Sequence, residues 1–401
     1  MHRRLTMNEN LLARARALQP WLTEIRRTLH RIPEPGNAEH ETSAFLSSQL
    51  DSIGIPHTRI GTGIVARLEG TAVQELASAK GSRKVVALRA DMDALPIQEP
   101  SDRPYASLHP GCMHACGHDA HMTIALGAAR ILASMRDSLP GTVVFIFQPA
   151  EETSGGAKPL IEAGCLENPH VDLVLGLHVI PELPAGRVEM RYGPFYGASD
   201  LLEIRIQGKN AHAAYPEQGV DAIVTASAVV QGLQSVVSRN VSALENAVVS
   251  IGTIQGGTVN NIIAREVVMK GTIRTLSEEV RERVRARVRE LTSGIAASYG
   301  AESEVIITPG YPVLINHDLA VDLVAQTARS LLGPDAVTIR QKPTLGVEDF
   351  AWYLKERPGA FWHLGCGPSS PLHSPQFDID ESCLPIGVAV QTAAVLSYLG
   401  N

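Results

Sequence analysis

The stretch 111–121, with the sequence GCMHACGHDAH, constrains this chain most strongly. It contains His114, Cys116, His118, Asp119 and His121. Thiolate, imidazole and carboxylate groups are the side chains that bind zinc, manganese, cobalt and nickel in proteins. Cys116 and His118 are two residues apart, so in an extended segment both side chains would point to the same side and reach one metal site. Asp119 is then expected to cap a helix that continues through HMTIALGAARILASM. The alternative is a loop with a buried free cysteine and polar caps, and the number of ligand types in so short a stretch favours the metal site.

Composition excludes several classes of protein. The chain has 401 residues, which is long for one hydrophobic core and predicts two domains. Its net charge of −7 and its aromatic content of 4% give no basic or base-stacking surface, so we expect neither a nucleic-acid partner nor a membrane partner. The five cysteines are an odd number without close spacing, which fits a reduced, cytoplasmic setting better than a disulfide framework.

The N-terminal 36 residues predict an amphipathic helix that ends at Pro33 and Pro35. They lack the apolar core of a signal peptide. Elsewhere, no segment is expected to reach the roughly 18 consecutive apolar residues that a membrane-spanning helix needs.

Three short apolar runs alternate with helical patterns in the first half of the chain. The runs at 84–88, 141–147 and 171–177 are rich in β-branched residues, and the patterns at 119–136 and 156–164 have helical spacing. This alternation predicts an α/β domain with a central, mostly parallel sheet and flanking helices. Polar residues follow each run, and ligands of such sheets gather beyond the carboxyl ends of the strands. We therefore expect one site there.

The pattern changes near residue 197. Residues 201–208 alternate apolar and polar, as in a strand with one solvated face, and further alternating strands and two helices follow up to residue 309. The sequence therefore predicts a catalytic domain in two segments, 1–196 and 310–401, with an α+β lid domain inserted at 197–309.

The acidic residues that follow the strands could serve two different roles, metal binding and proton transfer. Glu151 and Glu152 follow the second strand, and adjacent carboxylates diverge, so one can bind metal while the other acts as general base. The alternative is a solvated acidic turn, which the preceding apolar strand disfavours. Asp91 and Asp93 follow the first strand, where a carboxylate can orient a metal-bound imidazole. His178 after the third strand and His373 in a late loop are uninformative by themselves.

The inserted domain has its own candidate residues. His212 follows a strand, Asn260 lies in GGTVNNIIA, and Arg274 lies in GTIRT. An imidazole and an amide could stabilise a developing oxyanion, and an arginine could bind a substrate carboxylate through two hydrogen bonds. Surface turns for the asparagines and an ion pair on a strand face for Arg274 are equally acceptable interpretations.

The motifs MHACGHDAH, FQPAEE, GLHV, NAHAAYPEQGVDA, GGTVNNIIA, GTIRT, GVEDFAWY and LHSPQFDIDE occur in this order. Together they resemble the hippurate hydrolase and indole-3-acetyl–amino-acid hydrolase branch of the dinuclear aminoacylase/carboxypeptidase superfamily of metallopeptidases. The resemblance extends from LHRIPEPG, near residue 29, to the C-terminus.

The resemblance implies a role for each candidate. It implies that the metal ligands are Cys116, His118, Glu152, His178 and His373, with Cys116 bridging two ions. It implies that Glu151 is the general base, that Asp93 supports the ligands, and that His212, Asn260 and Arg274 contact the substrate. The wider superfamily has a ligand histidine where this chain has Asp91, so His118 is expected to supply the imidazole instead.

The implied activity is hydrolysis of the amide bond of N-acyl amino acids, such as hippurate or N-acetyl amino acids, by a metal-bound water. Two divalent ions per subunit are implied, zinc or manganese, with cobalt or nickel as alternatives. The resemblance also implies a homodimer formed through the lid domain. Alternatives are a dipeptidase, a carboxypeptidase or an N-acetyl-diaminopimelate deacetylase on the same site, or a metal-binding protein that has lost catalysis.

Overall fold

The computed structural model describes residues 2–72, 83–100 and 102–400. The chain forms two compact units. Unit 1 comprises Met1–Gly193, Asn316–Gln341 and Trp352–Asn401, and unit 2 comprises Pro194–Ile315 and Lys342–Ala351. The boundaries expected after residues 196 and 309, and the role of the insertion as a lid, stay predictions.

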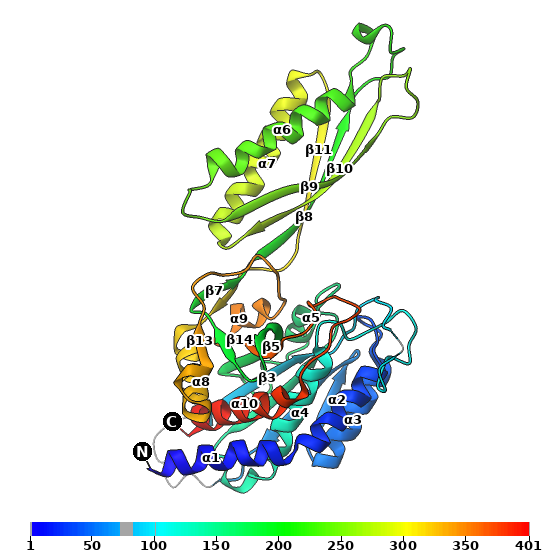
Figure 1. Cartoon of the computed structure of the whole chain (residues 1–401). Helices are drawn as coiled ribbons and strands as arrows, with labels where there is room; N and C mark the ends of the chain where they lie inside the picture. Colours follow the sequence, from blue (N-terminus) through cyan, green and yellow to red (C-terminus); the bar gives the residue numbers. More distant parts are fainter. Residues whose placement is uncertain (1, 73–82, 101, 401) are drawn as a thin grey trace. The chain divides into compact units, whose positions relative to one another are not determined.

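Unit 1 is built on an eight-stranded sheet with the order β1-β2-β4-β3-β5-β14-β6-β13 (Figure 1). The four central strands β4, β3, β5 and β14 run parallel, whereas β1 and β2 pair antiparallel with their neighbours. Strand β6 is antiparallel to β14 and parallel to β13. The strands are β1 (His57–Ile60), β2 (Gly63–Glu69), β3 (Val85–Asp91), β4 (Thr142–Gln148), β5 (Leu173–Pro184), β6 (Val188–Met190), β13 (Val337–Ile339) and β14 (Gly359–Gly367). This sheet confirms the predicted α/β class with a mostly parallel core.

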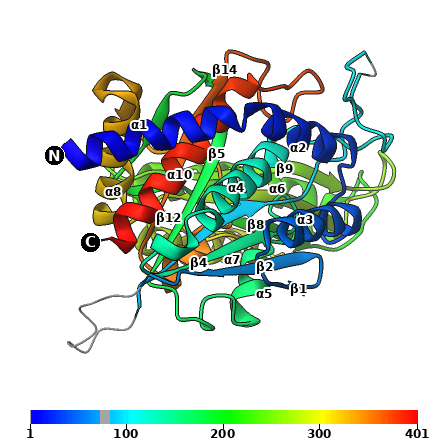
Figure 2. The same cartoon turned by 90° about the horizontal axis from the view of Figure 1, so that it is seen from below.

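Helices flank the sheet. They are α1 (His2–Ala17), α2 (Gln19–Arg31), α3 (His40–Ile53), α4 (His118–Ala133), α5 (Ala157–Glu162), α8 (Asp318–Leu332), α9 (Ala351–Glu356) and α10 (Leu384–Leu399). Figure 2 shows α1, α2, α4 and α10 together on one face of the sheet. The expected single N-terminal helix is wrong: α1 ends at Ala17 and α2 begins at Gln19, because Pro20 lacks the N–H needed to continue α1 but suits a first helical turn.

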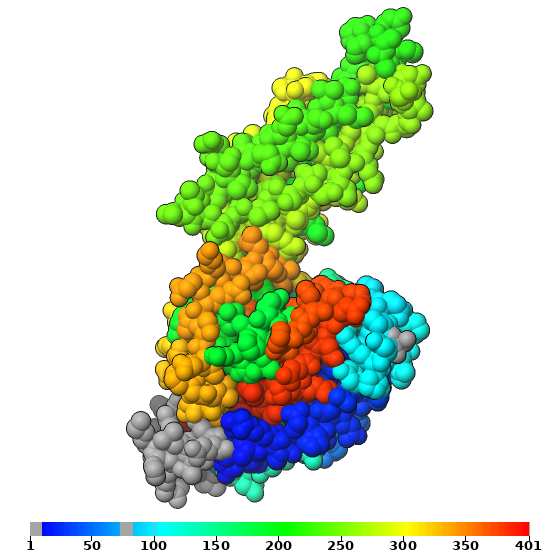
Figure 3. Space-filling model, in the orientation of Figure 1, coloured from blue at the N-terminus to red at the C-terminus, as the bar shows by residue number. Residues whose placement is uncertain are grey.

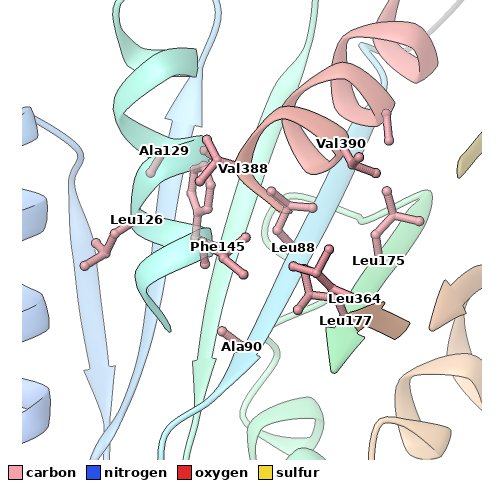
Figure 4. Close-up of a cluster of buried hydrophobic side chains, with 14 of the residues drawn as sticks. Leu88, Ala90, Leu126, Ala129, Phe145, Leu175, Leu177, Leu364, Val388 and Val390 are labelled. Atoms are coloured by element: carbon pink, nitrogen blue, oxygen red, sulfur yellow. The ribbon is translucent and has the colours of Figure 1, made fainter. Parts of the chain in front are cut away.

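The core of unit 1 lies between the sheet and this helical layer. Every residue of β3 and β4 is buried, as expected for central strands covered on both faces. Figure 4 shows strand residues Leu88, Phe145 and Leu175 directed toward α10, which carries Val388 and Val390. This packing fixes the carboxyl ends of the strands and the start of α4.

One helix of this core is long and apolar. The segment Glu381–Leu399 has a mean hydropathy of 1.5 and the length of a membrane-spanning helix. Within the protein, 72% of this segment is buried, and α10 packs against α4, α1 and α8. Its apolar character is explained by its place in the core.

Unit 2 contains a four-stranded antiparallel sheet with the order β11-β8-β10-β9. Its elements are β8 (Ala198–Gln207), α6 (Ala222–Asn240), β9 (Ala247–Gly256), β10 (Glu266–Thr275), α7 (Glu278–Ser298) and β11 (Glu302–Pro309), and the short strands β7 (Gly193–Tyr196) and β12 (Leu314–Asn316) pair with each other. Apolar residues of β8 and β10 pack with α6 and α7 in one core cluster. Residues of β8 alternate between buried and more exposed, because the helices cover only one face of the sheet.

Candidate metal centre

The carboxyl ends of the parallel strands bring the predicted ligands of unit 1 together. Asp91 ends β3, with Asp93 two residues beyond, and Glu151 and Glu152 follow β4. His178 lies within β5, which continues to Pro184 rather than ending before it. Cys116 and His118 stand at the start of α4, and His373 lies in the loop between β14 and α10. One end of the sheet therefore carries thiol, imidazole and carboxylate groups.

The turn before α4 differs from the expected extended segment. Gly117 has φ 83°, a left-handed conformation that favours glycine, and a Cβ there would lie 2.3 Å from Val179 Cγ2. Gly117, not Asp119, is the N-cap residue of α4, so the predicted capping role of Asp119 is wrong. The sharp turn, rather than strand alternation, directs Cys116 and His118 toward the same cluster.

Five candidate groups of ligand atoms occur among the described residues, and two of them share Cys116. In the first, the atoms of Cys116, His118 and His178 lie within 4.8 Å of one another, and in the second those of Cys116, Glu152 and His373 do so. Cys116 Sγ is 3.3 Å from His178 Nε2, and His373 Nε2 is 3.1 Å from Glu152 Oε1. A third group joins His118 and Glu152 to Glu151. All five predicted ligands and the predicted base thus meet, and Cys116 is shared by the first two groups.

Hydrogen bonds leave the imidazoles ready to bind a cation. His178 Nδ1 is 2.7 Å from the carbonyl oxygen of Val179, which can only accept, so Nδ1 carries the proton and the Nε2 lone pair faces Cys116. Both ring nitrogens of His118 are buried and make no hydrogen bond among the described residues, and Asp93 Oδ1 and Asp91 Oδ2 lie 3.4 Å from Nδ1 and 3.7 Å from Nε2. A buried imidazole without a hydrogen bond is costly, and a metal ion at Nε2 would satisfy that nitrogen. The donor set fits divalent transition metals.

Electrostatics favour a cation in the same place. Burial, and then the nearby Glu152 and Glu151 carboxylates, hold the pKa of the Cys116 thiol well above its usual value. Burial would lower the pKa of His118, but Asp91 and Asp93 outweigh burial and raise it to about 10. A thiolate would therefore form here only with a compensating positive charge, which a bound metal provides.

Asp93 and Asp91 support the ligands in different ways. Asp93 accepts hydrogen bonds from the backbone N–H groups of Glu151 and Glu152, at 2.9 and 3.0 Å, and lies 3.4 Å from His118 Nδ1. Asp91 Oδ1 is 2.6 Å from His121 Nδ1, and His121 Nε2 accepts the N–H of Val179 at 2.9 Å. Both ring nitrogens of His121 therefore have partners within the protein, although His121 also forms a candidate group of ligand atoms with Asp91 and His118.

The loop that carries His373 is tied to the start of α4. The backbone N–H of His373 donates to the carbonyl of Ala115 at 2.8 Å, next to Cys116. His373 itself has φ 64°, a left-handed conformation that is uncommon for a histidine. The side chain is half exposed, so it lies at the open side of the cluster. This backbone contact brings a C-terminal ligand to the central motif.

A network of buried charged residues connects α2 with Asp119 of α4, and it was not predicted from the sequence. Asp119 accepts from Arg26 Nε at 2.8 Å and lies 2.7 Å from His30 Nδ1, while His30 Nε2 is 3.0 Å from Glu99 Oε1. Arg26 also pairs with Asp378, in the loop after His373. In Figure 3 the N-terminal helices, the segment near residue 105 and the C-terminal loop lie side by side. Arg26 and His30 are one helical turn apart, and this spacing was the only available signal.

The remaining predicted residues lie in unit 2. His212 and Asn260 are exposed on neighbouring segments, joined by backbone bonds from Ala213 to Asn261 and from Ile263 to Ala211. Arg274 is half-buried on β10, and its Nη1 has no hydrogen-bond partner among the described residues. Burial lowers the pKa of Arg274. The alternative of a paired arginine on the strand face is therefore not supported for this Nη1.

Comparison with known proteins gives the family. The model of peptidase family M20/M25/M40 matches residues 87–397. A probable hydrolase of Synechocystis sp. is 41% identical over 395 residues, covering 96% of this chain and 98% of the relative. An N-acetyl-L-cysteine deacetylase of Bacillus subtilis is 40% identical, covering 92% and 85%. The structure of a dinuclear metal-binding M20 peptidase of Bacillus subtilis has a TM-score of 0.83 at 34% identity, covering 96% and 99%. The chain is thus a hydrolase that belongs to peptidase family M20/M25/M40.

Proposed function

We propose that this protein hydrolyses the amide bond of N-acyl amino acids with the help of two divalent metal ions. The observation that carries the proposal is that Cys116 belongs to both groups of ligand atoms, with Glu151 in a third group that shares His118 and Glu152. The same arrangement supports binding of two ions, with zinc or manganese as the first choices for a mixed thiolate, imidazole and carboxylate site. The similarity to a deacetylase of an N-acetylated amino acid supports the substrate class.

When bound at these residues, two ions would polarise the substrate carbonyl and lower the pKa of a water molecule. The protein supplies the proton transfer. Glu151 is 8% exposed, so little of this residue is open to bulk water. We assign it to take a proton as water attacks the acyl carbon and to deliver that proton to the leaving amine nitrogen. Its neighbour Glu152 holds a metal ion instead.

The residues of unit 2 are proposed to recognise the substrate. His212 would donate a hydrogen bond to the oxygen on which negative charge develops. Arg274, with an unsatisfied Nη1, would bind the carboxylate of the amino-acid product, and Asn260 would hold the same end of the substrate. Unit 2 would act as a lid and would exclude bulk water during the reaction.

We also propose a homodimer and a cytoplasmic location. Strand β9 is at the edge of its sheet and carries the exposed Ile254, and an open edge of this kind can pair with a second copy. Light scattering during gel filtration would give the mass in solution, and a monomer at working concentration would contradict the dimer. All five cysteines are free and buried, which suits a reducing compartment.

The decisive experiment combines metal exchange with a substrate panel. The protein is stripped with a chelator, reloaded separately with zinc, manganese, cobalt or nickel, and assayed on hippurate, N-acetyl amino acids, N-acetyl-diaminopimelate and dipeptides. We expect no turnover by the stripped protein and restored turnover on acylated amino acids. Preferential cleavage of dipeptides would instead indicate a dipeptidase or carboxypeptidase. Full metal loading without hydrolysis of any compound would indicate a metal-binding protein that has lost catalysis.

A further inference from the structure

The turn that presents Glu151 has a backbone conformation that must be held by its surroundings. Ala150, between β4 and Glu151, has φ 57°. The left-handed region is unfavourable for a residue with a Cβ, because the Cβ comes too close to the following carbonyl oxygen. Ala150 is fully buried, so its backbone N–H needs a hydrogen-bond partner. The backbone N–H groups of Glu151 and Glu152, which follow it, also need partners.

Glu39 supplies the first of these partners from far away in the sequence. Its carboxylate is fully buried, and Oε1 accepts the N–H of Ala150 at 2.9 Å across 111 residues. Oε2 accepts the hydroxyl of Thr62 at 2.6 Å. The two contacts fix the carboxylate at both oxygens, so it is a rigid anchor for the turn.

Asp93 is the hydrogen-bond partner of the next two backbone N–H groups in the turn. Glu39 accepts the N–H of Ala150, and Asp93 accepts those of Glu151 and Glu152. Three successive backbone N–H groups are therefore bound by two carboxylates. Because the direction of the Cα–Cβ bond follows from the backbone, this arrangement fixes the direction in which the Glu151 side chain leaves the turn.

The segment that precedes Glu39 packs closely against the turn that contains Ala150. A Cβ on Gly36 would lie 2.3 Å from Thr153 Oγ1 and 2.9 Å from Ala150 Cα, so only glycine allows this approach. Asn37 Nδ2 donates to Ser154 Oγ at 2.9 Å, and Ala94 N–H donates to the carbonyl of Glu34 at 2.8 Å. Residues 34–39 thus join the exit of β3 to the exit of β4.

We infer that Glu39 is a positioning residue for Glu151, acting through the backbone of Ala150. The inference rests on the proposed function, in which Glu151 is the general base. Glu39 is not itself placed to reach the substrate, since both of its oxygens are used within the protein. Its effect should therefore be on the rate of the proton-transfer step rather than on binding of metal or substrate.

The test is a double-mutant cycle of Glu39→Ala and Glu151→Gln in the metal-loaded protein. Alone, Glu39→Ala should lower kcat about tenfold or more, with KM and metal content unchanged, because a displaced base loses catalytic alignment. In the Glu151→Gln background, Glu39→Ala should change kcat by less than about threefold, because Glu39 and Glu151 act on the same step. Glu39→Gln should recover most of the rate, since its amide oxygen can accept from Ala150 while its NH₂ donates to Thr62.

A control comes from the same segment. Glu34 is another buried carboxylate, but it accepts the N–H groups of His40, Glu41 and Thr42 at the start of α3. Glu34→Gln should lower the melting temperature and leave kcat unchanged. If Glu39→Ala does not fold, Thr62→Val removes the second contact of Glu39 and should give a smaller loss of the same kind.

A readout independent of activity is hydrogen exchange in the metal-free protein. Glu39→Ala should speed amide exchange in the peptide that contains Ala150, and Glu34→Gln should not. Wild-type kcat in Glu39→Ala, or an equal loss with and without Glu151→Gln, would overturn the inference. Wild-type turnover by Glu151→Gln itself would instead overturn the proposed function.

Discussion

Cys116 Sγ lies 3.3 Å from His178 Nε2, although 62 residues separate them in the sequence. The same sulfur also lies within 4.8 Å of ligand atoms of Glu152 and His373. A thiolate at this point can contribute to two ion sites at once, whereas each of the other ligands lies in only one of the two groups that share Cys116. The metal content of the protein should therefore depend on this one side chain more than on any other.

We expect Cys116→Ala to lose most of its bound metal, because removal of a shared ligand weakens both sites. Elemental analysis after dialysis against limiting chelator measures the metal-to-protein ratio. Cys112→Ala is the matched control, since Cys112 is a buried cysteine in the same motif but outside every candidate group among the described residues. A full complement of metal in Cys116→Ala would count against its role as bridging ligand.

Glu151→Gln should separate catalysis from metal binding. We expect at least about a hundredfold lower turnover with unchanged metal content, because the amide cannot accept a proton from water. Steady-state kinetics with elemental analysis measures both. Glu152→Gln is the control and should lose metal. Unchanged turnover in Glu151→Gln would remove Glu151 from its proposed role.

His212→Ala should keep both metal and fold but react more slowly, by about tenfold or more, because a donor to the developing oxyanion is lost. His212 is exposed, so little packing is removed. Thermal unfolding, metal content and kcat on the best substrate of the panel check the three parts. His317→Ala, at an exposed histidine of unit 1, should behave as wild type. Normal kinetics in His212→Ala would place His212 outside the reaction.

The stability of the metal-free protein should depend on pH through His30. Burial and the neighbouring Arg26 lower the pKa of His30, but hydrogen bonds to Asp119 and Glu99 outweigh them, so the pKa is raised above 6.5. Protonated His30 therefore stabilises the fold fully below the unfolded pKa, and this contribution is lost as pH rises through the folded pKa. Above 6.5 the free energy of unfolding should fall by up to about 1.4 kcal/mol per pH unit relative to His30→Gln.

Urea unfolding of both proteins across pH 5.5–9, with chelator present, measures this difference. The other titrating groups are common to the two proteins, so their contributions cancel to first order. Parallel pH profiles for wild type and His30→Gln would show that His30 is not a buried cation. If the free energy of unfolding of wild type rose with pH relative to His30→Gln, the predicted sign would be wrong.

The outline of the fold and the ligand types of the site could be predicted from local patterns. Apolar runs at β3, β4 and β5 predicted central strands. Residues at strand ends converge in a parallel sheet, so Asp93, Glu151 and Glu152 were expected at one site. The order of the motifs then suggested the family that the comparison establishes.

The tertiary structure alone decided which contacts make those residues work together. The left-handed turn at Gly117, and not strand alternation, directs Cys116 and His118, because Val179 leaves no room for a Cβ there. Glu39 reaches Ala150 across 111 residues, and Arg26 reaches Asp119 across 93. The spacing of apolar residues along a sequence indicates only how residues a few helical turns or strand positions apart are arranged. Hydrogen bonds between distant segments depend on how the sheet and helices pack, so the residues of the candidate site could be predicted, whereas long-range contacts such as those of Glu39 and Arg26 could not.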